Sequence, residues 1–265
     1  MRKKIGCLII AITLLESNVH AQDLEYGVWA GIANYFGDLN YNASFEYIGP
    51  AGGFFFRYNL GTRFAFKQAL SYGRVAFEDA RSDFVYQQLR NLSFKSNIFE
   101  FSSHVEFHFF RYEKDRSRFS FTPYLLAGIS VFYFDPRTDY QGNTYRLKPL
   151  QTEGKNYSSI SLGIPVGGGF KYSFTYDWAI GIEGGYRKSF TDYLDDVSSV
   201  YPVQTGDGTL SGSLSDRSGE VTDPPIGFEG KQRGFAERFD DYLFIGIFIS
   251  YSPRREKCPK PSKIP

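Results

Sequence analysis

The stretch IFEFSSHVEFHFF, residues 98–110, decides the fold. Along most of it, aromatic and aliphatic side chains alternate with glutamate, serine and histidine. A period of two residues is typical of a β-strand whose two faces meet different surroundings. A soluble sandwich also produces this alternation, but aromatic side chains this large, repeated along one face, favour contact with lipid.

The same period recurs in seven further segments. The clearest are 159–172, where glycine and serine fill the polar face, and 178–186. The weaker segments are 25–35, 52–58, 63–75, 119–134 and 242–251. With 27 phenylalanines, 20 tyrosines and 27 glycines in 265 residues, the composition favours a membrane barrel with aromatic girdles and a narrow interior.

The connections between these segments alternate in length. Short connections at 59–62, 113–118 and 175–177 separate long ones at 36–51, 76–96, 135–158 and 192–240. This alternation is typical of an up-and-down barrel with tight periplasmic turns and longer outer loops. The sequence therefore predicts an all-β fold: an eight-stranded antiparallel transmembrane barrel over residues 22–252, with both ends in the periplasm. The part of the last loop at 204–230, rich in glycine, serine and aspartate, is expected to be loosely ordered.

A signal peptide is expected at residues 1–21. Arg2, Lys3 and Lys4 precede a short apolar run, and small residues end it at Val19-His20-Ala21. This address implies an oxidising compartment for the remaining chain.

Residues 253–265 form a basic, proline-rich tail that we expect in the periplasm. The simplest interpretation is a disordered, soluble end, but Cys258 is the one cysteine that follows the signal peptide. Because an unpaired thiol there is a liability, we hypothesise a disulfide between Cys258 and another protein. The neighbouring cations are candidate contacts for a partner or for lipid headgroups, and they are Arg254, Arg255, Lys257 and Lys260.

The polar faces of the strands carry charge that would point into the barrel. The predicted interior charges are Arg57, Lys67, Glu100, Glu106, Lys171, Glu183 and Arg187. Eight strands enclose a space that side chains just fill, so these charges must pair with one another. A structural salt-bridge plug is the expected role, and a proton or solute path is the alternative.

The sequence also contains residue types that metal sites and nucleophilic catalysis use. His104 and His108 share a face with Glu100 and Glu106, but residues four apart in a strand are roughly 13 Å apart along its axis, too far for one metal ion. A hydrolase would need a serine, a histidine and a carboxylate near one membrane interface, and no G-x-S-x-G motif is present. No enzyme activity, cofactor or small-molecule substrate is therefore expected. The net charge of +1 indicates no nucleic-acid partner.

Several motifs, in order along the chain, resemble the PorG family of outer-membrane barrels. They are YFGDL at 35–39, RYNL at 57–60, RNLSFKS at 90–96, PYLLAGI at 123–129, TDYLDDVS at 191–198, DYLF at 241–244 and Cys258-Pro259. The resemblance implies a component of the type IX secretion system, located in the outer membrane. Its implied role is structural, and consists of anchoring and positioning a periplasmic ring built by the lipoprotein PorK and by PorN.

Two other functions remain as alternatives. One is a lipid-modifying barrel enzyme, and the other is a passive envelope barrel of the OmpA/OmpX type that contacts outer-membrane lipids. The aspartates Asp192, Asp195 and Asp196 fall in a predicted outer loop. They are expected to form turns there, with a bound divalent cation as the alternative.

Overall fold

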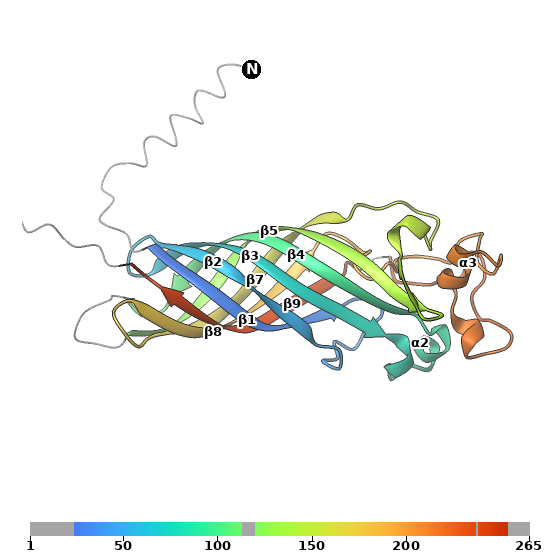
Figure 1. The fold of residues 1–265 in the computed structure, drawn as a ribbon, viewed down its shortest axis with the longest axis horizontal. Coiled ribbons are helices and arrows are strands. Elements are labelled where there is room, and N and C mark those ends of the chain that lie inside the picture. The colour runs from blue at the N-terminus through green and yellow to red at the C-terminus, as the bar shows by residue number, and fades with distance from the viewer. Residues whose placement is uncertain (1–23, 113–119, 237, 254–265) are drawn as a thin grey trace, which may run out of the picture.

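The computed structural model describes residues 24–112, 120–236 and 238–253. Eight antiparallel strands close into a barrel (Figure 1). They are β1 (Leu24–Phe36), β2 (Gly49–Asn59), β3 (Phe64–Glu78), β4 (Ser93–His108), β5 (Ser120–Tyr140), β7 (Ile160–Ser173), β8 (Trp178–Ser189) and β9 (Asp241–Tyr251). Strands that follow one another pair, and β1 pairs with β9, so the sheet closes on itself. The predicted eight-stranded antiparallel barrel is confirmed.

The two ends of the barrel differ as predicted. The described chain begins and ends at one end, where Ser252 donates a hydrogen bond to the Leu24 carbonyl. We call this the turn end, because the connections 60–63 and 174–177 are short there. The other end, the loop end, carries the long connections and all the described helices (Figure 1).

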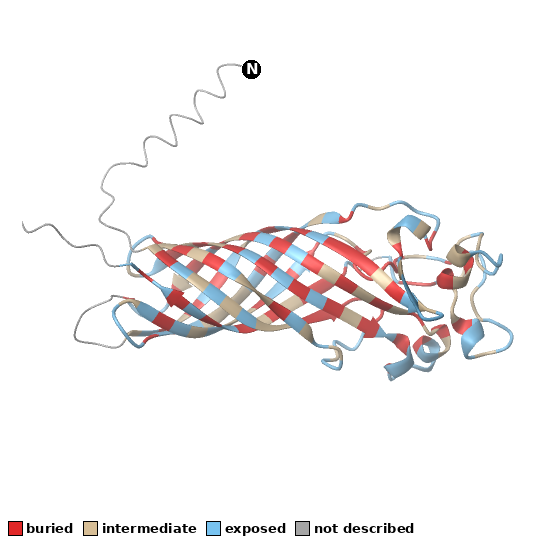
Figure 2. Ribbon diagram, in the orientation of Figure 1, coloured by how far each residue is buried: buried red, intermediate tan, exposed pale blue. Residues whose placement is uncertain are grey.

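In the barrel wall, successive side chains of each strand point alternately into the barrel and out of it. Figure 2 shows buried and exposed residues alternating along each strand. The outward-facing apolar side chains are exposed: Ile129 is 71% exposed and Phe54 is 62% exposed. Exposure on this scale is unfavourable in water and is typical of a lipid-facing surface.

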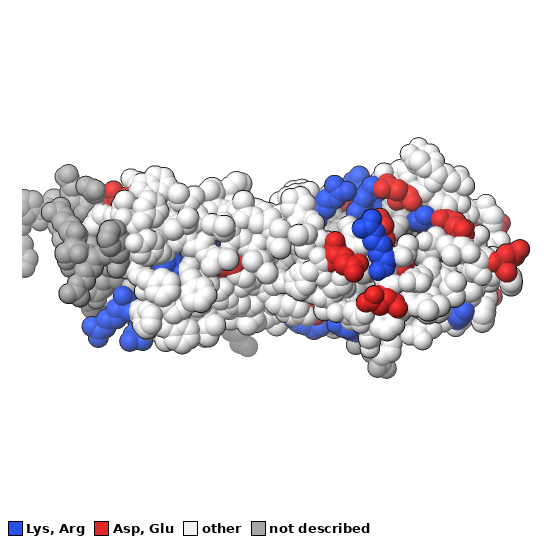
Figure 3. Space-filling view, turned by 90° about the horizontal axis from the view of Figure 1, so that it is seen from below, with Lys and Arg blue, Asp and Glu red and all other residues white. Residues whose placement is uncertain are grey.

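Aromatic side chains form a ring around the barrel at each end of this apolar band. Tyr26, Trp178 and Tyr251 lie at the turn end, and Tyr72, Tyr133 and Tyr186 lie at the loop end. In the described part of the wall, no outward-facing position between the two rings carries a charge. Charged side chains gather instead over the loop end, whereas the middle of the barrel shows few (Figure 3). The protein is thus a membrane barrel of the outer-membrane type.

The loop end contains more structure than the sequence indicated. The extended strand β5 forms a hairpin with a short strand, β6 (Asn143–Arg146). Helical segments in the loops are η2 (Asp79–Arg81), α2 (Val85–Arg90), η3 (Lys148–Leu150), α3 (Leu210–Ser215) and η4 (Ser218–Glu220). Within the described ranges, every helix is too short or too polar to cross a membrane.

The expectation of a loosely ordered segment at 204–230 is wrong. Thr209 caps α3 by accepting a hydrogen bond from the Gly212 amide, and Leu214 is buried in an apolar core with Leu194 and Val197. That core continues into the upper barrel, where it includes Phe132 and Phe244. The composition of the segment misled the prediction because two of its few apolar residues, Leu210 and Leu214, pack against this core.

Candidate functional site

The predicted interior charges come together inside the barrel. Six side chains near the turn end form what we call the inner cluster, which consists of Glu25, Arg57, Lys67, Glu106, Lys171 and Glu183. Arg57 lies between two carboxylates, with its Nη1 3.2 Å from Glu25 and its Nε 2.7 Å from Glu106. Lys171 contacts the other oxygen of Glu25 at 2.5 Å.

The cluster spans the bore from wall to wall. Lys67 on β3 lies 2.6 Å from Glu183 on β8 and 4.0 Å from Glu106 on β4. Tyr124 on β5 also donates a hydrogen bond to Glu183 at 2.6 Å. Three cations therefore balance three carboxylates, and the ion pairs tie strands on opposite sides of the barrel together. Pairing of this kind removes the penalty of burying an isolated charge.

Glu100 and Arg187 form a separate pair nearer the loop end. Their side chains meet at 3.2 Å, and Tyr242 donates to Glu100 at 2.8 Å. Arg187 also lies over the ring of Phe244. Between this pair and the inner cluster lies a cavity of about 20 Å³ beside His104. Such a volume has room for about one water molecule and not for a solute. The described interior is thus closely packed around this cavity.

The two histidines have different surroundings. His108 lies 3.5 Å from Glu106, whereas neither ring nitrogen of His104 has a hydrogen-bond partner in the described chain. Among the described residues, no group of three or more histidine, cysteine, aspartate or glutamate side chains has the geometry to hold a metal ion. The Ser102 hydroxyl, near His104 on the same strand, is likewise without a described partner, so no serine–histidine hydrogen bond links them.

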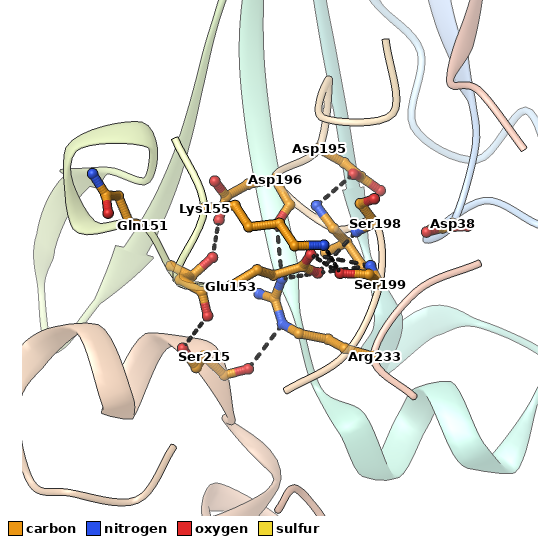
Figure 4. Close-up of polar contacts among 12 residues, drawn as sticks. Asp38, Gln151, Glu153, Lys155, Asp195, Asp196, Ser198, Ser199, Ser215 and Arg233 are labelled. Atoms are coloured by element: carbon orange, nitrogen blue, oxygen red, sulfur yellow. Dashed lines mark hydrogen bonds and ion pairs between the residues drawn. The ribbon is translucent and has the colours of Figure 1, made fainter. Parts of the chain in front are cut away.

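Arg233 holds the loop end together. Its guanidinium donates to Glu153 at 3.0 Å, to the Asp196 carbonyl at 2.7 Å and to the Ser215 carbonyl at 3.0 Å (Figure 4). Glu153 in turn accepts from the amides of Ser198 and Ser199. Arg233 thereby connects the loop between β6 and β7 with two distant parts of the loop between β8 and β9.

Arg90 provides a second connection. It donates two hydrogen bonds to Asp79, at 2.6 and 2.8 Å, and one to the Arg233 carbonyl at 2.5 Å. Asp38, from the loop after β1, accepts from the Phe235 amide at 2.8 Å. All four long loops are thus joined into one layer over the barrel mouth, which we call the cap.

The three aspartates singled out in the sequence lie inside the cap. Asp195 accepts hydrogen bonds from Tyr35 and from the Val197 amide, and Asp196 accepts from Thr152 and Tyr157. Burial raises the pKa of Asp196 to about 6, although Arg233 opposes this rise. Burial, and then the negative charges of Asp38 and Glu153, raise the pKa of Asp192 to about 7. The cluster is a buried acidic layer of the cap.

The predictions for the two chain ends concern residues outside the described ranges. These are the signal peptide at 1–21 and the tail residues Arg254, Arg255, Lys257, Cys258 and Lys260. At the turn end, the described surface consists of the connections 60–63, 109–112 and 174–177. It presents exposed aromatic side chains, including Phe110 and Phe174, and the exposed cations Arg63 and Arg111.

Sequence reasoning missed Glu25, Glu153 and the two arginines of the cap. Glu25 shares its strand face with Ala33 and Tyr35, so extending the alternation of the first strand would have found it. No comparable signal marks Arg90 or Arg233, because their partners are far away in the sequence.

Several solved structures are similar to the chain. Neisserial surface protein A is 11% identical, with 87% of this chain and 97% of that chain covered and a TM-score of 0.44. The attachment invasion locus protein Ail of Yersinia pestis, solved with the heparin analogue sucrose octasulfate, is 9% identical over 88% of this chain and 99% of that chain, with a TM-score of 0.42. The outer membrane protein OprG of Pseudomonas aeruginosa is 8% identical over 88% and 98%, with a TM-score of 0.41.

No curated protein matches the chain. A family model does: the one described as "Domain of unknown function (DUF6089)" matches residues 3–204, which include β1 to β8. Because the match covers most of the chain, this capped and plugged barrel belongs to the DUF6089 family.

Proposed function

We propose that this protein is a non-enzymatic anchor in the outer membrane, and that it holds a periplasmic ring of the type IX secretion system in place. The observation that carries the proposal is the double closure of the barrel. The inner cluster fills the bore, and the cap covers the mouth. A barrel closed in this way suits a scaffold better than a channel.

The motifs that resemble the PorG family point to the partner. Three of them, at 35–39, 90–96 and 191–198, meet in the cap: Asp38, Arg90 and Asp195 lie there. The resemblance thus involves residues that close the barrel, and closure is the property that the anchor role needs. The proposed partners are ring subunits resembling PorK and PorN.

The turn end is the proposed docking surface. With the long loops outside the cell, the short turns face the periplasm. The exposed aromatic and cationic side chains at 60–63 and 109–112 would meet the ring, together with the tail that carries Cys258.

The proposal is tested by deleting the gene and measuring secretion of a protein that carries a type IX sorting signal. We expect secretion to stop, and the wild-type gene to restore it. A variant ending after Ser252 should insert as a folded barrel but fail to restore secretion. Normal secretion in the deletion strain would refute the anchor role.

The same deletion strain distinguishes the anchor role from the alternative role of a lipid-modifying enzyme. Mass spectrometry of its lipid A and phospholipids should show the wild-type pattern, because the anchor has no turnover. For Cys258, non-reducing gels of native membranes should show a larger species that disappears in Cys258→Ser. A single band unchanged by reductant would exclude the disulfide.

A further inference from the structure

The outer surface of the barrel at the loop end carries a cluster of cations on one side. Four cations lie on adjacent strands: Arg74 on β3, Lys95 on β4, Arg137 on β5 and Arg146 on β6. We call them the rim cations. The register places Lys95 opposite Arg137, and Arg137 opposite Arg146. The side chains of Lys95, Arg137 and Arg146 are 26%, 41% and 51% exposed, and Arg74 is exposed as well.

A buried carboxylate fixes two of these arginines in place. Asp135, whose side chain is only 5% exposed, accepts hydrogen bonds of 2.8 Å from the Nε atoms of both Arg137 and Arg146. One carboxylate balances only one of the two guanidinium charges. The pair is therefore held in a defined geometry, with positive charge left over.

Lys95 pairs with a second carboxylate. Lys95 lies 2.6 Å from Asp139. Arg74 is exposed on the neighbouring strand β3, two residues before Ala76, which lies opposite Lys95. These four cations lie near three carboxylates, Asp135, Asp139 and the exposed Glu78 on β3, so the patch keeps an excess of about one positive charge.

An apolar groove lies directly below the rim cations. It has a volume of about 830 Å³ and runs across the wall from β2 to β7, lined by Gly52, Phe54, Leu70, Tyr72, Phe99 and Tyr133 among others. Tyr72 and Tyr133 belong to the aromatic ring at the loop end, two residues along the strand from Arg74 and Asp135. The groove therefore lies at the depth of the outer leaflet when the long loops face outward.

A glycine keeps the groove open. Gly52 lies between Ala30 on β1 and Tyr72 on β3. A Cβ added to Gly52 would lie 2.9 Å from the Trp29 carbonyl oxygen, so a side chain there would force the backbone to shift. The hollow is thus built into the backbone of the wall.

We propose that the rim cations and the groove form a binding site for a phosphorylated, acylated glycolipid of the outer leaflet. Phosphate groups at the level of the headgroups would pair with the guanidinium groups, for which arginine is well suited. Acyl chains would fill the groove below. This site goes beyond the anchor role and does not depend on it.

The opposite side of the rim lacks this arrangement. Over β8 and β9, Lys188 is 48% exposed, but it lies 2.8 Å from Asp241 and the two charges cancel. Lys188 is therefore a matched control, because it is an exposed cation at the same end of the barrel away from the groove.

The test is native mass spectrometry of the full mature chain in detergent micelles. The probes are bisphosphorylated hexa-acyl lipid A, the same lipid without phosphates, and phosphatidylglycerol. We expect the wild type to retain lipid A in preference to the other two. The double variant Arg74→Gln/Lys95→Gln, which leaves Asp135 and its arginines intact, should bind lipid A on the order of tenfold more weakly.

The variant Lys188→Gln should bind lipid A as the wild type does. Both variants change residues that are at least partly exposed, and the heat-dependent gel mobility of a folded barrel confirms that they fold. Equal retention of lipid A by wild type and double variant would overturn the proposal. So would equal retention of phosphatidylglycerol or of dephosphorylated lipid A by the wild type, or a similar loss in Lys188→Gln.

Discussion

Arg57 shows how single residues stabilise the interior. It is fully buried and lies between Glu25 and Glu106, over the rings of Phe55 and Phe248. Buried ion pairs contribute little net stability compared with apolar packing, but removing one partner leaves an uncompensated charge. We therefore expect the inner cluster to tolerate the loss of a member poorly.

We expect Arg57→Met to destabilise the barrel by about 3–5 kcal/mol, because two carboxylates lose their shared cation. Urea unfolding of the purified protein in micelles measures this change. Arg111→Met, at an exposed position of the turn end, is the matched control and should unfold like the wild type. An unchanged unfolding midpoint for Arg57→Met would show that the cluster is not coupled to closure.

The raised pKa of Asp192 predicts that the stability of the cap depends on pH. Burial raises its pKa from 3.8 to about 7, so the folded cap favours the protonated carboxyl. This contribution to stability is fully present below pH 4 and is lost as the pH rises through 7. Protease cleavage within 190–236 should therefore be faster at pH 8 than at pH 5, and Asp192→Asn should reduce the difference.

Asp83→Asn is the control for this experiment, because Asp83 is an exposed aspartate in another outer loop. It should leave the pH dependence as in the wild type. Cleavage that is equally fast at both pH values in the wild type would contradict a titrating cap.

Among the elements, the strands were predictable and the cap was not. Segments such as 98–110 carry the period of two that their environment imposes, so all eight strands were found. Six of them were located to within about three residues, whereas β4 begins five residues earlier and β5 ends six residues later than predicted. Six of the seven predicted interior charges have their ion-pair partners within that predicted set, since strand parity alone decides which side chains point inward.

The cap depends on contacts that no local pattern records. Arg233 reaches Glu153 across 80 residues, and Arg90 reaches the Arg233 carbonyl across 143. Strand β6 was missed because four residues are too few to show a period. The order of 204–230 likewise comes from tertiary packing of Leu214, which composition does not reveal.

The pairing of β7 with β8 requires close approach at a glycine. A Cβ at Gly169 would lie 2.4 Å from the Ile182 carbonyl oxygen and 2.7 Å from the Tyr124 hydroxyl oxygen. At Gly184, on the facing strand, it would meet only Ile245, at 3.6 Å. We expect Gly169→Ala to lower the folded fraction after refolding into micelles, and Gly184→Ala to fold like the wild type. Gel mobility with and without heating measures the folded fraction. Equal folding of both variants would contradict the register between β7 and β8.

At the scale of the whole molecule, two independent closures act in series. The inner cluster fills the bore near the turn end, and the cap covers the mouth at the loop end. The turn end and the rim of the loop end thus lie on opposite sides of the apolar band. The proposed anchor role and the proposed lipid site use opposite ends of the barrel, so each proposal can fail without the other.

The most direct test of the sealed scaffold is ion conductance of the full mature chain in a planar lipid bilayer. The account predicts a folded, inserted barrel whose current does not differ from that of the bilayer alone. Steady single-channel currents from the wild-type protein would contradict it, since ions would then pass both the inner cluster and the cap.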